Sequence, residues 1–345
     1  MTKGKIGFAC KWIDTPDQVD GIKPKDDARK YSTGTTTVAW LSRQSRDVAE
    51  QKLLDVTKQN LQNTINLVNK VASLPDQLRM VRLSSEILPV YTHVDWSYFY
   101  QQQQIQRILE LGFAKIGEIA RKHNVRLSFH PGQFCVLASE NPGIVNNSIA
   151  EFEYHSDMAR MMGYGKTFQD FKINVHISGK LGADGIRAAY RRLSPVAQNC
   201  ITIENEENSW GLDDCLSLSD LLPIVLDVHH HWCREGIYIN PTSDSVKRVV
   251  DSWRGVRPTM HYSISREDYL IDHCSNTKPD YTKLLDTGYK KAKLRAHSDF
   301  YWNHAVNDWV LGFTETHDIM CESKAKNLAS FALYKKLINS NDFTC

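Results

Sequence analysis

Short apolar runs alternate with longer, partly polar stretches along most of this chain. The runs are rich in apolar and β-branched residues, which is typical of strands buried on both faces of a parallel sheet. The pattern predicts strands at 6–10, 80–84, 126–130, 172–176, 200–204, 224–228, 259–263 and 317–321.

The stretches between these runs are long enough for crossover helices. Apolar residues recur at close to helical spacing in the first of them, for example at Leu53, Leu61 and Val68. Helices are therefore expected at 46–72, 101–123, 145–163 and 184–192. Strands that alternate with helices eight times predict a single α/β domain over 1–345. The expected fold is a (β/α)8 barrel of TIM type, with its core over about 5–330 and a C-terminal tail over about 331–345.

Two insertions interrupt the regular alternation. One covers 11–45, after the first predicted strand, and the other covers 85–100, after the second. Both would emerge at the same face of a barrel, where long loops usually serve binding. The second insertion is rich in aromatic residues, namely Tyr91, Trp96, Tyr98, Phe99 and Tyr100. These rings would either stack on displaced bases or cover the barrel, and the sequence favours neither reading.

Composition and charge exclude several classes of protein. The chain has 345 residues, with 42 Lys and Arg against 40 Asp and Glu and a net charge of +2, so it is not a bulk polycation. Nucleic-acid binding would need local clusters of basic residues. No apolar run approaches the length of a membrane span, and the N-terminal residues lack the apolar stretch of a signal peptide. We therefore expect a cytoplasmic protein that does not contact a membrane.

The cysteines indicate reduced thiols. There are eight, scattered and without a C-x-x-C pair, which argues against a disulfide framework or a zinc ribbon. Cys10, Cys135, Cys200 and Cys321 lie in or beside apolar runs, so we expect them to pack in the core.

Imidazole and carboxylate side chains fall at the ends of six predicted strands or just beyond them. They are His130, His176, Glu204, Asp227, His230, His261 and Glu322. In a barrel, the carboxyl ends of all strands surround one mouth, so these groups should converge. Imidazole with carboxylate suits Mn, Zn or Fe, and the set exceeds what one tetrahedral ion needs. Two neighbouring ions bridged by Glu204 would suit phosphoester hydrolysis.

Each histidine also has a simpler reading as a packed core residue. Glu204 is different, because its run is otherwise apolar and a buried carboxylate needs a partner. His229 and His231 flank His230, and only one or two of the three are expected to point inward. Surface or helix positions are expected for His93, His123, His155, His273, His304 and His317.

At these residues the chain resembles the UV damage endonucleases. The matching segments are MVRLSSEILP (80–89), LSFHPGQF (127–134), INVHISGK (173–180), ITIENEE (201–207), VLDVHHH (225–231), MHYSIS (260–265), AHSDF (296–300) and MCESKAK (320–326). They occur in the order of the family and span about 5–330. The resemblance implies a barrel and a metal-cluster plan that the family shares with endonuclease IV.

The resemblance further implies a metal-dependent DNA repair endonuclease. Such an enzyme nicks duplex DNA 5′ to cyclobutane dimers and 6-4 photoproducts, and in some members at abasic sites. It would hold up to three Mn2+ ions, with Zn2+, Mg2+ or Co2+ as substitutes. The implied ligands are His130, His176, Glu204, Asp227, His230, His261, His297 and Glu322. Among them, Glu204, His261 and Glu322 are the expected catalytic residues.

Lesion contacts are implied by the same resemblance. The family probes damage with a Gln-Tyr pair after HPG, and here the pair is Gln133–Phe134, although Phe134 would also suit the core. The chain departs from the family at Phe8, where Tyr is frequent, and at Trp12, where Asn is usual. It also has Thr259 where members carry a lysine reported as modified, which alters the expected metal environment.

Basic residues near the predicted mouth are candidates for phosphate contacts. They are Lys11, Arg43, Arg46, Lys180, Arg187, Arg266 and Lys324. Lys180 is the strongest of them because it follows a predicted ligand closely. With Gln133, Phe134, Trp12 and Phe8, it completes the expected DNA- and lesion-binding set.

Other functions fit the same barrel. An endonuclease IV-like abasic-site enzyme, a xylose-isomerase-like sugar isomerase and an inactive DNA-binding protein are the alternatives, since fold alone does not separate them. A small-sugar pocket would not require the third group of ligands or the Gln133–Phe134 probe. We expect a monomer acting on UV-damaged duplex DNA, near the nucleoid in a bacterium or in the nucleus of a eukaryote.

Overall fold

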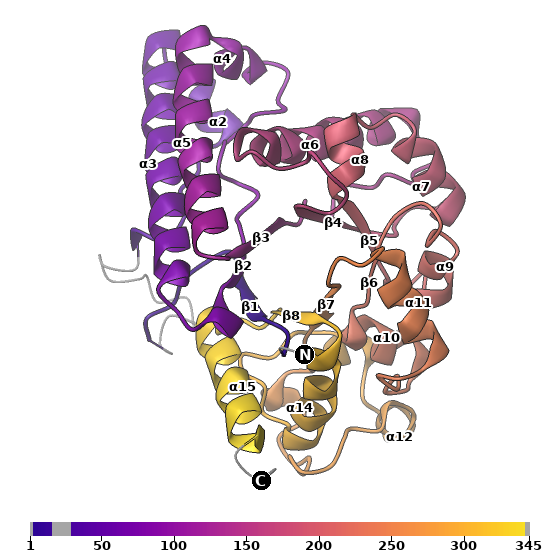
Figure 1. The fold of residues 1–345 in the computed structure, drawn as a ribbon. Coiled ribbons are helices and arrows are strands. Elements are labelled where there is room, and N and C mark those ends of the chain that lie inside the picture. The colour runs from indigo at the N-terminus through magenta and orange to yellow at the C-terminus, as the bar shows by residue number, and fades with distance from the viewer. Residues whose placement is uncertain (1–2, 16–28, 342–345) are drawn as a thin grey trace.

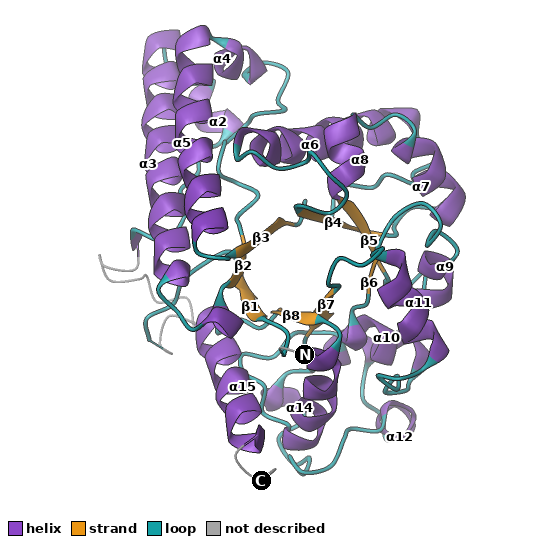
Figure 2. Ribbon diagram, in the orientation of Figure 1, coloured by secondary structure: helices purple, strands orange, loops and turns teal. Residues whose placement is uncertain are grey.

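A ring of parallel strands forms the centre of the molecule. The computed structural model describes residues 3–15 and 29–341. Within these residues, eight strands are surrounded by helices (Figures 1 and 2). The strands are β1 (Ile6–Ala9), β2 (Met80–Arg82), β3 (Arg126–Phe129), β4 (Lys172–His176), β5 (Ile201–Glu204), β6 (Ile224–Val225), β7 (Thr259–Tyr262) and β8 (Asp318–Cys321).

The strand order shows how the ring closes. Hydrogen-bonded neighbours run β6-β5-β4-β3-β2-β1-β8-β7, and every pair is parallel. Between the two ends, Asp227 and His261 form a parallel bridge, and His261 N donates to Leu226 O over 3.0 Å. The predicted (β/α)8 barrel is confirmed, with β6 shorter than expected because the chain turns into a helix at Asp227.

The outer layer consists of helices of very different length. They are α2 (Val38–Leu41), α3 (Arg46–Ala72), α4 (Ser97–Gln101), α5 (Gln103–Lys122), α6 (Pro142–Met161), α7 (Gly182–Tyr190), α8 (Pro195–Cys200), α9 (Leu212–Leu216), α10 (Val228–Glu235), α11 (Asp244–Ser252), α12 (Tyr281–Asp286), α13 (Lys291–Leu294), α14 (His304–Leu311) and α15 (Lys326–Asn341). The predicted helix over 46–72 matches α3, and the other three predictions differ from α5, α6 and α7 by one to three residues at their ends. Short 3-10 helices cover Asp76–Leu78, Glu267–Tyr269 and Gly312–Glu315.

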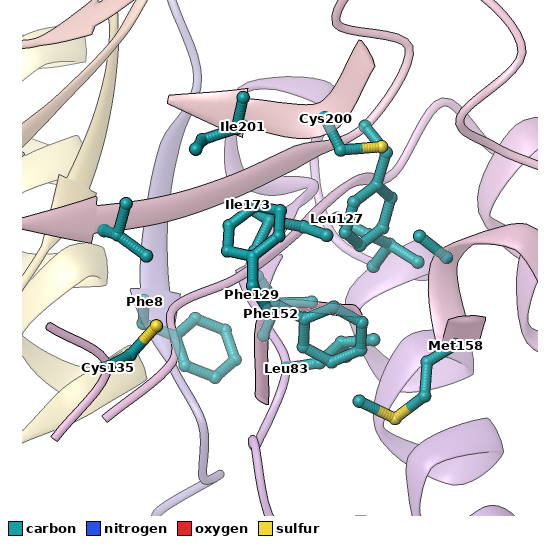
Figure 3. Close-up of a cluster of buried hydrophobic side chains, with 14 of the residues drawn as sticks. Phe8, Leu83, Leu127, Phe129, Cys135, Phe152, Met158, Ile173, Cys200 and Ile201 are labelled. Carbon is teal, nitrogen blue, oxygen red and sulfur yellow. The ribbon is translucent and has the colours of Figure 1, made fainter. Parts of the chain in front are cut away.

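Helices α3 and α5 pack side by side along one flank of the barrel (Figure 1). Their close approach depends on Gly112, where an added Cβ would lie 2.8 Å from a methyl carbon of Leu61. The main core lies between the strands and the helices. Figure 3 shows part of it, where Phe129 and Ile173 of the sheet meet Phe152 of α6.

Helix α15 belongs to this core. Helix α15 packs against β1, and its Leu333 and Leu337 are buried. Asn327 at its start bonds both N and O of Ile13. Residues 331–341 were predicted as part of a C-terminal tail, and this prediction is wrong. They belong to helix α15, whose apolar residues cover β1. None of the helices described here has the length and apolar character to cross a bilayer.

The two insertions differ in how they are placed. Residues 16–28 of the first lie outside the described residues. In the second, Trp96, Phe99 and Tyr100 are buried, and Tyr91 stacks on Tyr154 with the ring centres 4.7 Å apart. These aromatic rings therefore pack in the core instead of offering a surface on which bases would stack.

The cysteines pack as expected. Those among the described residues are free, and Cys135, Cys200 and Cys321 are buried. Cys10 is only partly buried, with its Sγ 3.9 Å from Leu83 O.

Candidate metal centre

Glu204 lies at the centre of the barrel mouth. It ends β5, is fully buried, and its carboxylate oxygens approach four imidazoles, from β4, β7, helix α10 and the loop after β3. The distances are 3.0 Å to His261 Nδ1, 3.2 Å to His130 Nε2, 3.6 Å to His230 Nδ1 and 3.9 Å to His176 Nε2. The convergence expected at the strand ends is thus present around one carboxylate.

Three overlapping sets of these side chains have the spacing of metal ligands. In each set, one candidate ligand atom per residue lies within 4.8 Å of the others. The sets are His130, His261 and Glu322; His130, His176 and Glu204; and Glu204, Asp227 and His261. Because they share members, the cluster suits more than one ion, and its oxygen and imidazole donors suit Mn or Zn.

The carboxylate of Glu204 is held from below by the neighbouring strand. Asn174 Nδ2 donates to Glu204 Oε2, and Asn174 Oδ1 accepts from Thr202 Oγ1 over 2.8 Å. Burial alone raises the pKa of Glu204, but the charges of His261 and His176 outweigh it and hold the pKa well below its usual value. The group is therefore a carboxylate, as a bridging ligand must be.

The two carboxylate oxygens of Asp227 have different surroundings. It is the N-cap of α10, and its Oδ1 accepts from the backbone N–H groups of His229 and His230 over 2.8 and 2.7 Å. Its Oδ2 is buried without a hydrogen-bond partner among the described residues. Burial raises the pKa of Asp227 well above its usual value. A buried oxygen with no donor is a position that a cation would satisfy.

The tautomers of two histidines follow from backbone carbonyls, which only accept. His130 Nδ1 lies 3.0 Å from Pro131 O, and His230 Nδ1 lies 3.0 Å from Asn205 O. In its neutral form, each ring would therefore carry its proton on Nδ1 and leave the lone pair of Nε2 free, as a ligand role through Nε2 requires. The Nε2 of His230 lies 3.7 Å from Glu207 Oε2. Burial lowers the pKa of His230, but Asp227 and Glu204 raise it to about 9 overall.

Two basic side chains also touch the cluster, one buried (Lys172) and one partly buried (Arg82). Arg82 of β2 forms an ion pair with Glu322, which lies 3.4 Å from His261 Nδ1. Burial raises the pKa of Glu322, but Arg82 and His261 lower it to well below the usual value. Lys172 of β4 lies with its Nζ 2.9 Å from His261 Nε2, and burial lowers its pKa to about 7.

The sequence predictions missed two residues of the site, Lys172 and Asn174. The alternation of side chains between the two faces of a strand would have indicated them. Lys172, Asn174 and His176 are spaced by two along β4, so they face the same side, into the barrel. Only His176 of the three was predicted, because a lysine and an asparagine are not typical ligands. Thr259, two residues before His261, is buried with its Oγ1 unpartnered among the described residues.

Three further histidines near the cluster, His229, His231 and His297, belong to none of the three ligand sets. His297 is half-buried, and its ring centre lies 5.7 Å from that of His229. Its metal role therefore stays a prediction. His229 stacks on Trp232, whereas neither nitrogen of His231 has a partner among the described residues.

Two of the histidines expected at surface or helix positions are fully buried. His155 lies on helix α6, as expected, and its Nδ1 donates to Glu151 O over 2.7 Å. His317 precedes β8 and contacts Thr316 Oγ1 over 2.8 Å, so it is neither a surface nor a helix residue. Its polar neighbour explains why an imidazole is tolerated there.

The expected lesion-binding residues separate into two groups. Phe134 is 86% exposed and Gln133 is also exposed, so core packing is the wrong reading for this ring. Phe8 is fully buried, and Trp12 packs between Phe8 and Phe331, so neither ring offers a surface to DNA here.

Most of the basic candidates for phosphate contacts have acidic partners. Lys180 is exposed and lies 2.8 Å from Glu140. Arg46, Arg187, Arg266 and Lys324 pair with Glu50, Asp220, Asp268 and Asp299, whereas Lys11 and Arg43 are exposed.

Comparison with known proteins agrees with this geometry. The family model described as UV-endonuclease UvdE matches residues 6–344. A UV DNA damage endonuclease of Bacillus cereus is 26% identical over 318 residues and covers 88% of both chains. One from Bacillus velezensis is 30% identical over 253 residues, covering 69% of this chain and 73% of its own.

Solved structures show the same fold. SacUVDE superimposes with a TM-score of 0.69 at 23% identity, over 98% of this chain and 99% of its own. Endonuclease IV from Thermus thermophilus gives a TM-score of 0.50 at 12% identity, over 80% and 93%.

Proposed function

The chain belongs to the UV-endonuclease UvdE family, and we propose that it repairs DNA by incising the strand 5′ to UV photoproducts with a cluster of divalent metal ions. Cyclobutane dimers and 6-4 products are the proposed lesions, and Mn2+ is the proposed metal. The observation that carries the metal dependence is the group of four imidazoles around the buried Glu204 carboxylate.

The residues of the cluster fit a metal role in kind and in environment. Glu204, Asp227 and Glu322 would supply oxygen ligands, and the histidines would supply nitrogen ligands, His297 among them. The unpartnered Asp227 Oδ2 supports this assignment, since a buried carboxylate oxygen is costly without a partner. Bound divalent ions would supply activation of water and stabilisation of charge at the phosphate. Asn174, Asn205 and the backbone of α10 keep the ligands oriented.

Damage recognition is assigned to the loop that follows His130. Gln133 and Phe134 project from this loop, and a groove of about 640 Å3 beside Phe134 is lined by Val90, Val94 and Gly132, among others. An exposed ring next to a groove can fill the gap left by a base that turns out of the duplex. A pocket for a small sugar has no need of such a ring, which favours a DNA substrate over a sugar.

Phe134→Ala is expected to impair recognition of lesions. The ring would stack on bases at the damaged site, and such stacking contributes about 1–3 kcal/mol per base, or roughly 5- to 150-fold in affinity. Competition binding of irradiated against untreated duplexes measures the preference directly, and metal content measured on the same samples should not change.

Ile271→Ala is the matched control, because Ile271 is also an exposed apolar side chain, at 81%. The control should keep the preference for irradiated DNA. If Phe134→Ala retains the full preference as well, the ring does not probe the lesion.

A further inference from the structure

A lysine lies in the interior of the barrel, beneath the proposed metal centre. Lys172 begins β4 and is only 3% exposed. Lysine is rarely this buried, because removing its ammonium group from water is costly. Its position therefore requires a compensating interaction.

The compensating contact reaches across the barrel. Strands β4 and β7 are not neighbours in the sheet, yet Lys172 Nζ lies 2.9 Å from Nε2 of His261 on β7. This is the hydrogen bond that the described structure shows for the amine. The same ring has its other nitrogen, Nδ1, 3.0 Å from Glu204 and 3.4 Å from Glu322.

The amine of Lys172 could have extended into a nearby cavity, but it contacts His261 instead. A cavity of about 520 Å3 opens at the opposite end of the barrel, and Lys172 lines it with Lys5, Asp170 and other polar residues. A lysine that served only to fill space would extend its amine into such a cavity, toward water. Here the amine instead contacts a predicted metal ligand, which indicates a role in the site.

We propose that Lys172 is a positioning residue for the metal centre: it holds Nε2 of His261, so that Nδ1 is the nitrogen that meets the metal beside Glu204 and Glu322. The inference rests on the proposed metal-dependent function. For Nδ1 to offer its lone pair to a metal, Nε2 must carry the ring proton, and Nε2–H then donates to the neutral amine of Lys172. Without this contact, the ring loses the group that sets its orientation.

The geometry distinguishes His261 from the other histidines of the cluster. His130 and His230 are oriented by backbone carbonyls at Nδ1 and present Nε2. His261 has the reverse arrangement, with a side chain at Nε2 and Nδ1 toward the carboxylates. Because its orienting group is a side chain, it is the one of these three whose orientation a single substitution can remove.

Lys172→Met tests the proposal, because methionine has similar length and no hydrogen-bonding nitrogen. Loss of a group that orients a ligand typically weakens metal binding by 10- to 100-fold. Titration calorimetry with Mn2+ should therefore show at least one site weakened by about that factor. In the Zn2+-loaded protein, nitrogen NMR of the His261 ring should show Nδ1 as the ligand atom in the unmodified chain and a mixture in the variant.

Gln169→Met is the control for a purely structural effect. Gln169 is buried and lines the same cavity, but within the described residues its side chain donates only to the backbone oxygens of Asn199 and Ile201. It should lower thermal stability without changing metal affinity. Metal affinity and a His261 spectrum unchanged in Lys172→Met would overturn the positioning role, even where stability falls.

The outcomes separate this inference from the proposed function. If the unmodified chain binds no divalent metal, the proposed function itself fails. If the unmodified chain binds metal and nicks irradiated DNA, and Lys172→Met matches it in affinity and in the NMR signature, only the role of Lys172 is refuted.

Discussion

Glu204→Gln is expected to abolish cleavage of irradiated DNA, with a loss of about 10³-fold or more. Removing a single group that stabilises a transition state typically costs 10²–10³ in rate, and Glu204 contributes to two of the three ligand sets. Glutamine keeps the volume of the side chain but removes the negative charge that the surrounding imidazoles stabilise. The variant should still fold and bind DNA, because the proposed DNA contacts lie on other loops. Nicking rates measured together with metal content and duplex affinity test this.

Glu206→Gln is the matched control, because Glu206 lies two residues after Glu204, in the loop that follows β5. The Glu206 carboxylate accepts from Ser209 N over 3.1 Å and has no contact with the imidazoles. Cleavage close to that of the unmodified chain is expected for it. Normal cleavage by Glu204→Gln as well would remove the bridging role from the account.

Asp318→Ala is expected to lower the free energy of unfolding by about 3 kcal/mol. This value is near the lower end of the range of costs for removing one partner of a buried ion pair. The Asp318 carboxylate receives Arg126 Nη1 over 2.6 Å, Arg257 Nε over 3.1 Å and the backbone N of Lys5 over 2.7 Å. It therefore ties β8 to β3, to the turn before β7 and to β1 at the end of the barrel opposite the metal centre. Without it, two guanidinium groups remain close together without their shared carboxylate. Both are partly exposed, which moderates the cost.

Urea unfolding measures this change, and Asp244→Ala provides the comparison. Asp244 pairs with Lys247 on the surface of α11, where the aspartate is 95% exposed, so its loss should leave the midpoint nearly unchanged. Equal midpoints for the two variants would show that the Asp318 network does not stabilise the barrel.

The architecture was predictable because both faces of each strand in a parallel barrel are buried, one by the barrel interior and the other by the surrounding helices. Such strands read as short apolar runs, and each observed strand lies within a predicted run. The site was predictable for a related reason. The barrel places every strand end at one mouth, so polar residues such as His176 and Glu204 stand out against apolar neighbours.

The features that were missed depend on contacts between distant segments. The apolar run over 6–10 already indicated a buried Phe8, whereas only contacts with Phe8 and Phe331 show that Trp12 lies in an aromatic cluster. Lys172 reads as an ordinary charged residue until β7 brings His261 to it across the barrel. The last helix was missed because its apolar residues are weakly periodic, so only the packing of Leu333 on the barrel reveals its role.

Nicking of supercoiled plasmid tests the central claim most directly, using irradiated and untreated DNA with Mn2+ present or chelated. Conversion to the open circle is expected only for irradiated plasmid with Mn2+, and it should stop with a chelator and return when metal is restored. A metal-loaded protein that leaves irradiated plasmid intact, or that nicks it equally well after complete chelation, would contradict the account.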